Sequence, residues 1–186
     1  MKGSMLVGFL AILFVGLLPV TLLSQSHLED NAHHDHHHSS GFWRMSIFMG
    51  HTYLPTNTIT GRELLVLPSM GLDIEYWFNH TWGIGLHNDL ELLTFEIERE
   101  EDVFVDREYP VLLTLDLLWH PQWGLVFYTG PGIELEPNEN FFVFRAGVEY
   151  EINLGDVWDF YPSVFYDYRE DAYDTFTVGL GFGRKF

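Results

Sequence analysis

The alternating pattern from Thr175 to Phe186 is the sequence feature that most constrains the fold of this chain. Apolar and small residues take turns there, in the order Phe176, Thr177, Val178, Gly179, Leu180, Gly181, Phe182 and Gly183. A period of two places one set on each face of a β-strand. A strand this apolar on one face needs a cover, and in a membrane barrel the lipid covers it while the small residues face the lumen.

The same alternation returns throughout residues 41–186, in segments of about ten residues or more, separated by turn residues. We predict eight strands, approximately Phe42–Tyr53, Leu64–Phe78, Trp82–Ile97, Tyr109–Trp119, Trp123–Glu136, Phe141–Ile152, Trp158–Tyr168 and Thr175–Phe186. Loops are expected at Pro55–Gly61, Glu98–Glu108 and Pro137–Asn140, with Arg169–Asp174 leading into the last strand. The predicted fold is all-β: an eight-stranded antiparallel up-and-down transmembrane β-barrel.

The tryptophans support this strand count and its orientation. All six are expected at strand ends on the side of the two barrel termini: Trp43, Trp77, Trp82, Trp119, Trp123 and Trp158. Tryptophan prefers the membrane–water interface, so the arrangement predicts an aromatic girdle. The alternative is a soluble, lipocalin-like barrel whose apolar face points inward and whose acidic residues face water.

The first forty residues read as two segments that precede the barrel. Lys2 and the apolar run Leu6–Leu23, followed by Ser24-Gln25-Ser26, predict a signal peptide over residues 1–26, with a retained membrane anchor as the alternative. Residues 27–40 are polar and rich in histidine, which predicts a disordered tether, and residues 41–186 form the barrel. The sequence has no cysteine, which excludes a lipoprotein anchor and a disulfide scaffold.

The formal net charge of −18 limits the classes of partner. Nucleic acid is not expected, because phosphates attract a basic surface. An acidic surface suits cations instead.

The alternating segments and the ending Gly181-Phe182-Gly183-Arg184-Lys185-Phe186 resemble the small eight-stranded outer-membrane β-barrel proteins of Gram-negative bacteria. The resemblance implies a location in outer-membrane lipid with both termini in the periplasm. It also implies that the barrel assembly machinery recognises Phe182 and Phe186. Arg184 departs from this pattern, since an apolar or aromatic residue is usual there. Barrels of this kind serve as tethers, adhesins, small pores and lipid-modifying enzymes, so the fold leaves the function open.

The predicted lumen is acidic. The carboxylates expected to face inward are Asp73, Glu75, Asp89, Glu91, Asp116, Glu134, Glu136, Glu149, Glu151 and Asp167. Only Arg44 and Arg145 are expected to oppose them, with His87 nearby. Enclosed carboxylates must pair, bind cations, keep water or change protonation. Two interpretations stay open: a polar plug of ion pairs and water, or a porin-like interior that accepts or conducts cations.

Two further groups are candidate metal ligands. The tether carries His33, His34, Asp35, His36, His37 and His38, which could hold zinc, nickel or copper, although a plain spacer or a purification tag has the same composition. The predicted outer loops carry Glu98, Glu100, Glu101, Asp102, Asp106 and Asp171, which could bind calcium or magnesium or form a repulsive solvated surface.

Catalysis is not expected. A lipid hydrolase needs a serine beside a histidine and an acid, and the predicted strands offer Ser46, Ser69 and Ser163, none of them close in sequence to a histidine. The predicted function is therefore a non-enzymatic barrel with a structural or binding role in the envelope. A cation-permeable or metal-handling barrel is the first alternative, and a lipid-modifying enzyme is the second.

Overall fold

The computed structural model describes residues 41–58, 61–100, 103–170 and 172–186. The predicted signal peptide and His-rich tether lie outside this range. The described chain forms strands only: β1 Phe42–Thr58, β2 Gly61–Trp77, β3 Trp82–Glu91, β4 Thr94–Glu100, β5 Val103–Glu108, β6 Val111–Trp119, β7 Leu125–Leu135, β8 Phe141–Tyr150, β9 Ile152–Asn153, β10 Trp158–Arg169 and β11 Thr175–Lys185. Among the described residues, no helix is long and apolar enough to cross a membrane.

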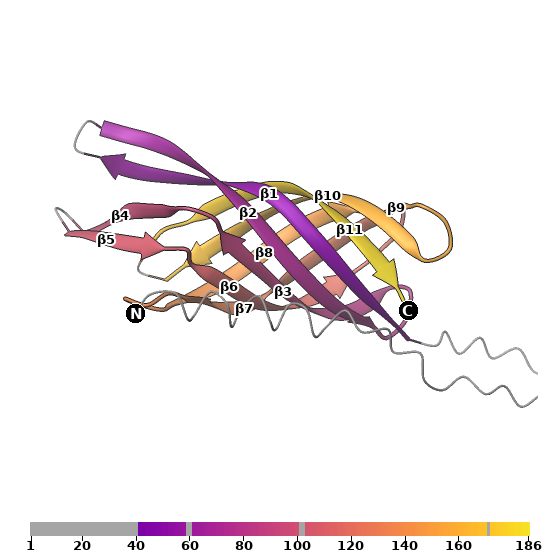
Figure 1. The fold of residues 1–186 in the computed structure, drawn as a ribbon. Helices are drawn as coiled ribbons and strands as arrows, with labels where there is room; N and C mark the ends of the chain where they lie inside the picture. The colour runs from indigo at the N-terminus through magenta and orange to yellow at the C-terminus, as the bar shows by residue number, and fades with distance from the viewer. Residues whose placement is uncertain (1–40, 59–60, 101–102, 171) are drawn as a thin grey trace, which may run out of the picture. The chain divides into compact units, whose positions relative to one another are not determined.

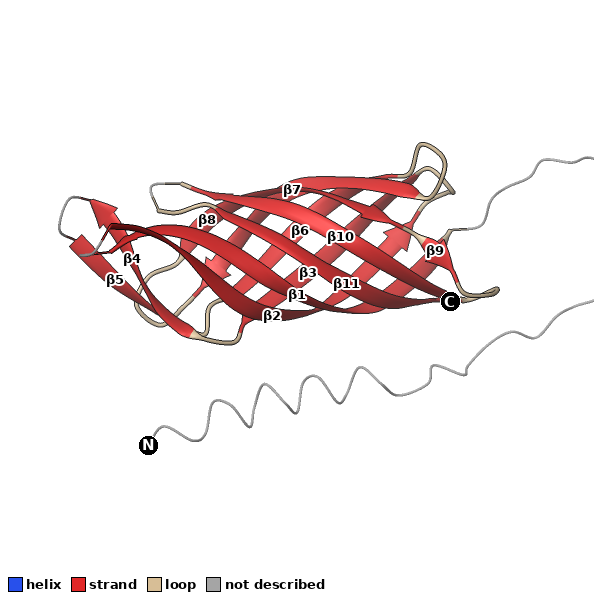
Figure 2. Cartoon of the chain, turned by 90° about the horizontal axis from the view of Figure 1, so that it is seen from above, coloured by secondary structure: helices blue, strands red, loops and turns tan. Residues whose placement is uncertain are grey.

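Eight of these strands close into an antiparallel barrel (Figures 1 and 2). Their order is β11-β1-β2-β3-β6-β7-β8-β10, and β10 pairs with β11 to complete the ring. The short β9 pairs with β10 beyond the end of β8. The predicted eight-stranded up-and-down barrel is therefore confirmed.

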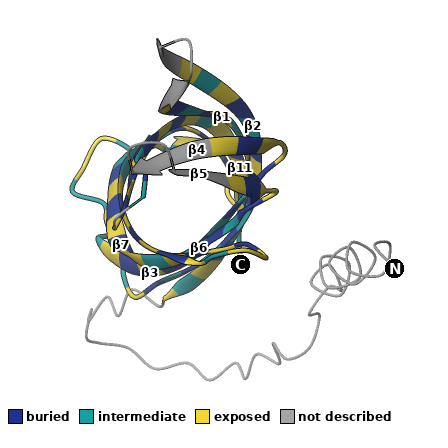
Figure 3. Cartoon of the chain, turned by 90° about the vertical axis from the view of Figure 1, so that its left-hand side faces the viewer, coloured by how far each residue is buried: buried dark blue, intermediate teal, exposed yellow. Residues whose placement is uncertain are grey.

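The side chains alternate between an apolar exterior and a charged interior. In β6, Leu115 is 57% exposed while its neighbour Asp116 is fully buried. In β11, Leu180 is 53% exposed while Thr177 is buried. Figure 3 shows this alternation around the ring when the barrel is viewed along its axis. A water-soluble barrel has the opposite polarity, so the exterior has the character of a lipid-facing surface.

Glycines in the wall make room for large aromatic rings inside. A Cβ on Gly181 would lie 2.0 Å from the ring of Tyr161, and one on Gly147 would lie 2.4 Å from the ring of Tyr128. Both distances are shorter than van der Waals contact, so these rings lie directly on the glycine backbone. The small residues of the alternating segments therefore serve the interior packing, which glycine permits because it has no Cβ.

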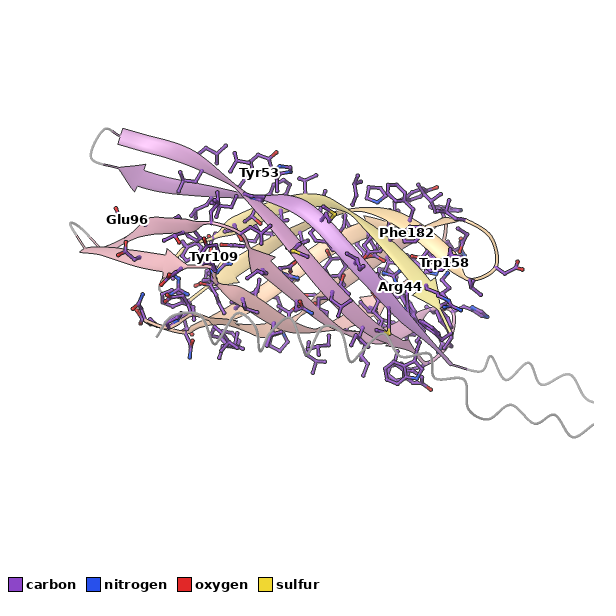
Figure 4. All side chains as sticks on the ribbon, viewed as in Figure 1. Arg44, Tyr53, Glu96, Tyr109, Trp158 and Phe182 are labelled. Carbon is purple, nitrogen blue, oxygen red and sulfur yellow. The ribbon has the colours of Figure 1, made fainter. Side chains whose placement is uncertain are left out.

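The apolar band has the height of a membrane. Exposed Trp43 and half-buried Tyr53 lie on the outer face of β1, ten positions apart, and Figure 4 labels Tyr53. Ten residues at about 3.4 Å per residue, tilted by about 40°, span roughly 25 Å along the barrel axis. This matches the apolar band of a membrane barrel.

The end of the barrel where β1 begins and β11 ends is called the terminal end, and the opposite end of the barrel is called the far end.

The first predicted loop is wrong: Pro55–Gly61 lies largely in strands. The ladder of β1 and β2 continues through Pro55↔Leu64 to Thr58↔Gly61. On its other side, β1 pairs with β11 only as far as Tyr53↔Phe176. Pro55 therefore lies in an edge segment, where its missing N–H costs no ladder bond.

The predicted continuation of the third strand to Ile97, and the predicted acidic loop Glu98–Glu108, are also wrong. β3 ends at Glu91, and β4 (Thr94–Glu100) and β5 (Val103–Glu108) pair with each other as a separate two-stranded sheet, here called hairpin β4–β5. Phe95 and Arg107 are paired across it and both are buried, while Glu96 and Asp106 are paired and exposed. An amphipathic hairpin of this kind needs a surface to cover, and the far mouth of the barrel provides it.

The tryptophan girdle is confirmed for five of the six residues. Trp43, Trp82, Trp119, Trp123 and Trp158 are exposed on the terminal side, four of them at strand ends and Trp123 in the turn before β7. Trp77 is only 3% exposed and points inside, where its indole N–H donates a hydrogen bond to Glu75 (2.7 Å).

Candidate functional site: the ion-paired interior

The interior of the barrel holds an excess of carboxylates over cations. Among the described residues, ten buried acids face four buried arginines; the acids are Asp73, Glu75, Asp89, Glu91, Asp116, Glu134, Glu136, Glu149, Asp159 and Asp167. The arginines are Arg44, Arg107, Arg145 and Arg169. Burying a charge is costly unless it is paired and hydrogen-bonded, so the arrangement of these partners determines what the interior can do.

The terminal-end cluster consists of Arg44, Glu75, Glu149, Glu151 and Lys185. Arg44 donates from Nη2 to Glu75 Oε1 (2.8 Å) and to Glu149 Oε1 (2.5 Å). Lys185 donates from Nζ to Glu151 Oε1 (2.5 Å), and Glu151 Oε2 lies 3.6 Å from Arg44 Nη1. The cluster joins β1, β2, β8, β11 and the segment after β8 across the lumen.

A second group occupies the middle of the barrel. Arg145 donates to both oxygens of Asp167, from Nε (2.7 Å) and Nη2 (3.0 Å), and its Nη1 lies 2.6 Å from Asp89 Oδ2. His87 Nδ1 lies 2.9 Å from Asp116 Oδ2. Asp73 has no ion pair among the described residues and accepts a hydrogen bond from the Tyr161 hydroxyl (3.1 Å).

The far-end cluster consists of Arg107, Glu134, Glu136, Arg169 and Tyr173. The Glu134 carboxylate accepts hydrogen bonds from Arg107, from Arg169 and from the Tyr173 hydroxyl, the last at 2.8 and 2.9 Å. Arg107 also donates to Glu136 Oε2 (3.1 Å). Burial raises the pKa of the Tyr173 phenol well above its usual range, which keeps the hydroxyl protonated as a donor.

Hairpin β4–β5 caps the far mouth of the barrel, and Arg107 and Phe95 attach it. The Arg107 side chain enters the far-end cluster, and the Phe95 ring packs edge-on against Tyr173, with centroids 5.9 Å apart. Phe95 and Tyr173 belong to a buried cluster with Leu54, Leu67 and Phe141. Figure 3, which looks into this end, shows β4 and β5 in front of part of the opening.

Each buried arginine is stacked on an aromatic ring. The distances from guanidinium carbon to ring centroid are 4.7 Å for Arg44 on Tyr161, 4.5 Å for Arg107 on Phe141, 4.0 Å for Arg145 on Phe165 and 4.3 Å for Arg169 on Tyr173. Carboxylates accept hydrogen bonds from the edge of each guanidinium, and an aromatic ring covers its face. Both parts of the guanidinium therefore have a partner in the desolvated interior.

A cavity lies between these groups. A central cavity of about 10 Å³ is lined by residues that include Asp73, His87, Asp89, Glu149 and Tyr161. This volume is enough for about one water molecule. In the described part of the chain, no group of three or more His, Cys, Asp or Glu side chains is arranged to hold a metal ion.

The structure brings most of the sequence-predicted residues into one interior. The three groups together contain Arg44, Asp73, Glu75, His87, Asp89, Asp116, Glu134, Arg145, Glu149 and Glu151, and Glu91 Oε1 lies 3.6 Å from Arg169 Nη2. Phe182 and Phe186 lie on the exterior of the terminal end, and Figure 4 labels Phe182 there beside Trp158. His33, His34, Asp35, His36, His37 and His38 lie outside the described residues, as does Asp171.

Two of the four buried arginines, Arg107 and Arg169, were not expected in the interior. Arg169 was assigned to a loop, although it continues the inward parity of Asp167 by one step, and β10 ends on it. Arg107 was assigned to the acidic loop, and only its alternation with Asp106 and Glu108 hinted at an opposite face. The prediction of only two inward arginines is therefore wrong.

The three serines considered for catalysis are all buried. The Tyr161 hydroxyl is hydrogen-bonded to Ser46 Oγ (2.8 Å), and Ser163 is hydrogen-bonded to Tyr128 (2.8 Å). Ser69 Oγ has no hydrogen-bond partner among the described residues. None of these hydroxyls is hydrogen-bonded to a described histidine.

A closed antiparallel barrel of eight strands, apolar outside and ion-paired inside, defines the class of small membrane β-barrels. No protein-family model and no curated protein matches the chain. Among solved structures, the chain is similar to Ail, the attachment invasion locus protein of Yersinia pestis, in complex with the heparin analogue sucrose octasulfate. The TM-score is 0.55 at 16% identity, over 79% of this chain and 99% of that one.

Two structures from Pseudomonas aeruginosa also match. The outer membrane protein OprG has a TM-score of 0.49 at 16% identity, over 80% of this chain and 97% of that one. The N-terminal β-barrel domain of OprF has a TM-score of 0.43 at 16% identity, over 77% and 97%. The similarity to Ail shows that the chain has the fold of a small outer-membrane β-barrel.

Proposed function

We propose that this protein is a closed, non-enzymatic outer-membrane β-barrel with a structural or binding role at the cell envelope. The observation that carries the proposal is the interior, in which each of the four buried arginines of the described chain is ion-paired to carboxylates and stacked on a ring. A lumen filled in this way by the described residues leaves no open path for ions, which supports a structural barrel whose loops and ends are exposed for binding, rather than a channel.

The closed state is supported at both ends of the lumen. The cap residues Phe95 and Arg107 pack into the far mouth, as described above. Toward the terminal end, Trp77, Leu118 and Val126 are buried with Phe42 packed against them. An ion would have to displace apolar side chains and break ion pairs to pass, and both are costly in a desolvated interior.

A binding role would take a cationic partner. Ail was solved with a sulfated sugar, which is a polyanion. The cap of the present chain exposes Glu96, Asp106 and Glu108 at the far end, and the chain carries a net charge of −18. These charges repel a polyanion and attract a cationic ligand or divalent ions. Figure 4 labels Glu96 on this hairpin.

The N-terminal segments and the C-terminal aromatic residues have roles in export, metal binding and assembly under the same proposal. Residues 1–26 act as a signal peptide, residues 27–40 as a periplasmic tether that binds zinc, nickel or copper through its histidines, and the termini lie in the periplasm. Phe182 and Phe186 serve recognition by the barrel assembly machinery. The outward exposure of both rings supports this role. Loss of zinc affinity on deletion of residues 33–38 tests the metal ligands, and unchanged affinity would contradict them.

Conductance in planar lipid bilayers tests the closed lumen. The purified protein should be electrically silent. The alternative of a cation-permeable barrel is favoured by one observation, the excess of buried carboxylates over arginines. A steady cation-selective conductance that Glu149→Gln alters would establish that alternative and contradict the proposal. A change in lipid A or phospholipid acyl chains on overexpression would contradict the non-enzymatic assignment.

A further inference from the structure

Arg184 carries a positive charge on the outer face of the barrel, beside the aromatic residues of the terminal end. It lies in β11, where its Cα pairs with Met45 of β1 and with Trp158 of β10. Its side chain is exposed, in contrast to the four arginines of the interior. The adjacent Lys185 faces the other way and enters the terminal-end cluster.

Two aromatic rings hold the Arg184 side chain against this surface. Its guanidinium carbon lies 5.4 Å from the centroid of Trp158 and 4.8 Å from that of Phe186. The Trp158 ring stacks on Phe182 (5.1 Å), and the backbone of Phe186 is held by its N–H, which donates to Trp43 O (2.8 Å). The guanidinium of Arg184 therefore lies against the aromatic surface of the barrel wall.

Arg184 has no acidic partner in the part of the chain that the structure describes. No described carboxylate forms an ion pair with it, whereas Lys185 has Glu151 and Asn153 within 3.0 Å. In so acidic a chain, an arginine kept clear of carboxylates and seated among interfacial aromatics has its counter-ion outside the protein. At this level of a membrane barrel, the anions within reach are lipid headgroups.

We propose that Arg184, together with Trp158 and Phe186, binds the phosphate of a phospholipid headgroup at the membrane surface next to the terminal end. The site rests on the proposed membrane insertion. A guanidinium presents paired N–H donors that match phosphate oxygens, and the rings bury against the glycerol and upper acyl carbons. Free phosphate would use only the guanidinium, so the aromatic residues favour the lipid.

Native mass spectrometry of the detergent-purified barrel, titrated with phosphatidylglycerol and phosphatidylcholine, measures the affinity of the first bound lipid. Arg184→Gln should weaken phosphatidylglycerol binding by about fivefold, the factor that corresponds to roughly 1 kcal/mol per basic residue at a lipid surface. Arg184→Lys should keep most of the affinity. Lys185→Gln removes the same charge from the inward face and should leave the affinity unchanged.

Three outcomes would overturn the site. First, Arg184→Gln could leave the lipid affinity unchanged. Second, Lys185→Gln could weaken the affinity equally, which would show that binding depends on net charge alone. Third, inorganic phosphate at millimolar concentration could displace the lipid. Heat-dependent electrophoretic mobility of each variant reports folding. A wild-type protein without that mobility shift would refute membrane insertion and the site together, whereas a normal shift with equal lipid binding in Arg184→Gln refutes the site alone.

Discussion

Individual residues set the packing of the barrel wall, and the contact between Gly181 and Tyr161 is the tightest pairing of a glycine with an aromatic ring. A Cβ at position 181 would lie 2.0 Å from the ring of Tyr161. The Tyr161 ring cannot move away easily. The guanidinium carbon of Arg44 lies 4.7 Å from the ring centroid, and the Tyr161 hydroxyl is hydrogen-bonded to Ser46 and Asp73.

Gly181→Ala should destabilise the folded barrel by about 1–3 kcal/mol, the usual cost of overpacking. Urea unfolding in lipid vesicles measures the change. In a Tyr161→Ala background the same substitution should cost much less, because the clashing ring is gone. Equal destabilisation in both backgrounds would contradict the proposed contact.

Asn88 is a polar residue on the outer face of β3. Its side chain takes the place of backbone hydrogen bonds that are missing between β2 and β3. Pairing between β2 and β3 stops after Gly71↔Asp89 and resumes at Ile74↔Leu86 without a change of register. The Asn88 side chain bridges this gap, donating to Leu72 O and accepting from Leu72 N (3.4 Å). It thereby satisfies backbone groups that lipid cannot.

Asn88→Leu tests this bridge against the gain of an apolar side chain in lipid. We expect a loss of about 1–2 kcal/mol in the free energy of unfolding, since two hydrogen bonds of about 1 kcal/mol each are removed. Leu90→Ala, on the same face of β3, serves as a packing control. A stabilised Asn88→Leu variant would show that the bridge is dispensable.

At the scale of elements, hairpin β4–β5 determines whether the far mouth is closed. Arg107 provides the charged link between this hairpin and the barrel, through Glu134, Glu136 and the backbone carbonyl of Glu139 (2.7 Å), beside the apolar contact of Phe95. Removing one partner of a buried ion pair costs about 3–5 kcal/mol, because a charge is left uncompensated.

The absence of cysteine makes closure measurable by labelling. Thr175, which accepts a hydrogen bond from Arg169 below the cap, is 1% exposed, so Thr175→Cys should react slowly with a water-soluble maleimide. Adding Arg107→Ala should raise the labelling rate at least about tenfold, since 1.4 kcal/mol already corresponds to that factor. Asp106→Ala, on the exposed face of the same strand, should leave it unchanged. Fast labelling before Arg107 is altered would contradict the cap.

The sequence predicted the strands of the barrel better than it predicted the cap. Alternation over β6, β7, β8, β10 and β11 is regular, because one face meets lipid and the other the interior along each strand. The cap is different: Phe95 and Arg107 are buried between exposed neighbours, but they cover a mouth made by distant strands, and nothing in the local sequence indicates which elements they meet. For the same reason Arg107 could not be assigned to the interior, whereas the inward parity of Glu134 and Glu149 could be read directly.

At the scale of the whole molecule, the polarity of the barrel distinguishes a membrane protein from a soluble one. Leu115 lies at the middle of β6 and is 57% exposed. In a bilayer, Leu115→Arg should destabilise the barrel by about 2–4 kcal/mol, because the charge meets hydrocarbon. Folding into lipid vesicles under urea measures this, with Leu115→Ala as the control for lost side-chain volume. A cost within about 0.5 kcal/mol, as at an ordinary wet surface, would contradict a lipid-facing exterior.

The central claim, a closed barrel inserted in the outer membrane, is tested most directly by electrophoretic mobility of the protein extracted from envelopes, with and without boiling. A barrel whose eight strands are all paired resists detergent until it is heated. We predict a heat-dependent shift, with the protein in the outer-membrane fraction. A mobility that is the same before and after heating, with the protein in the soluble fraction, would contradict the account.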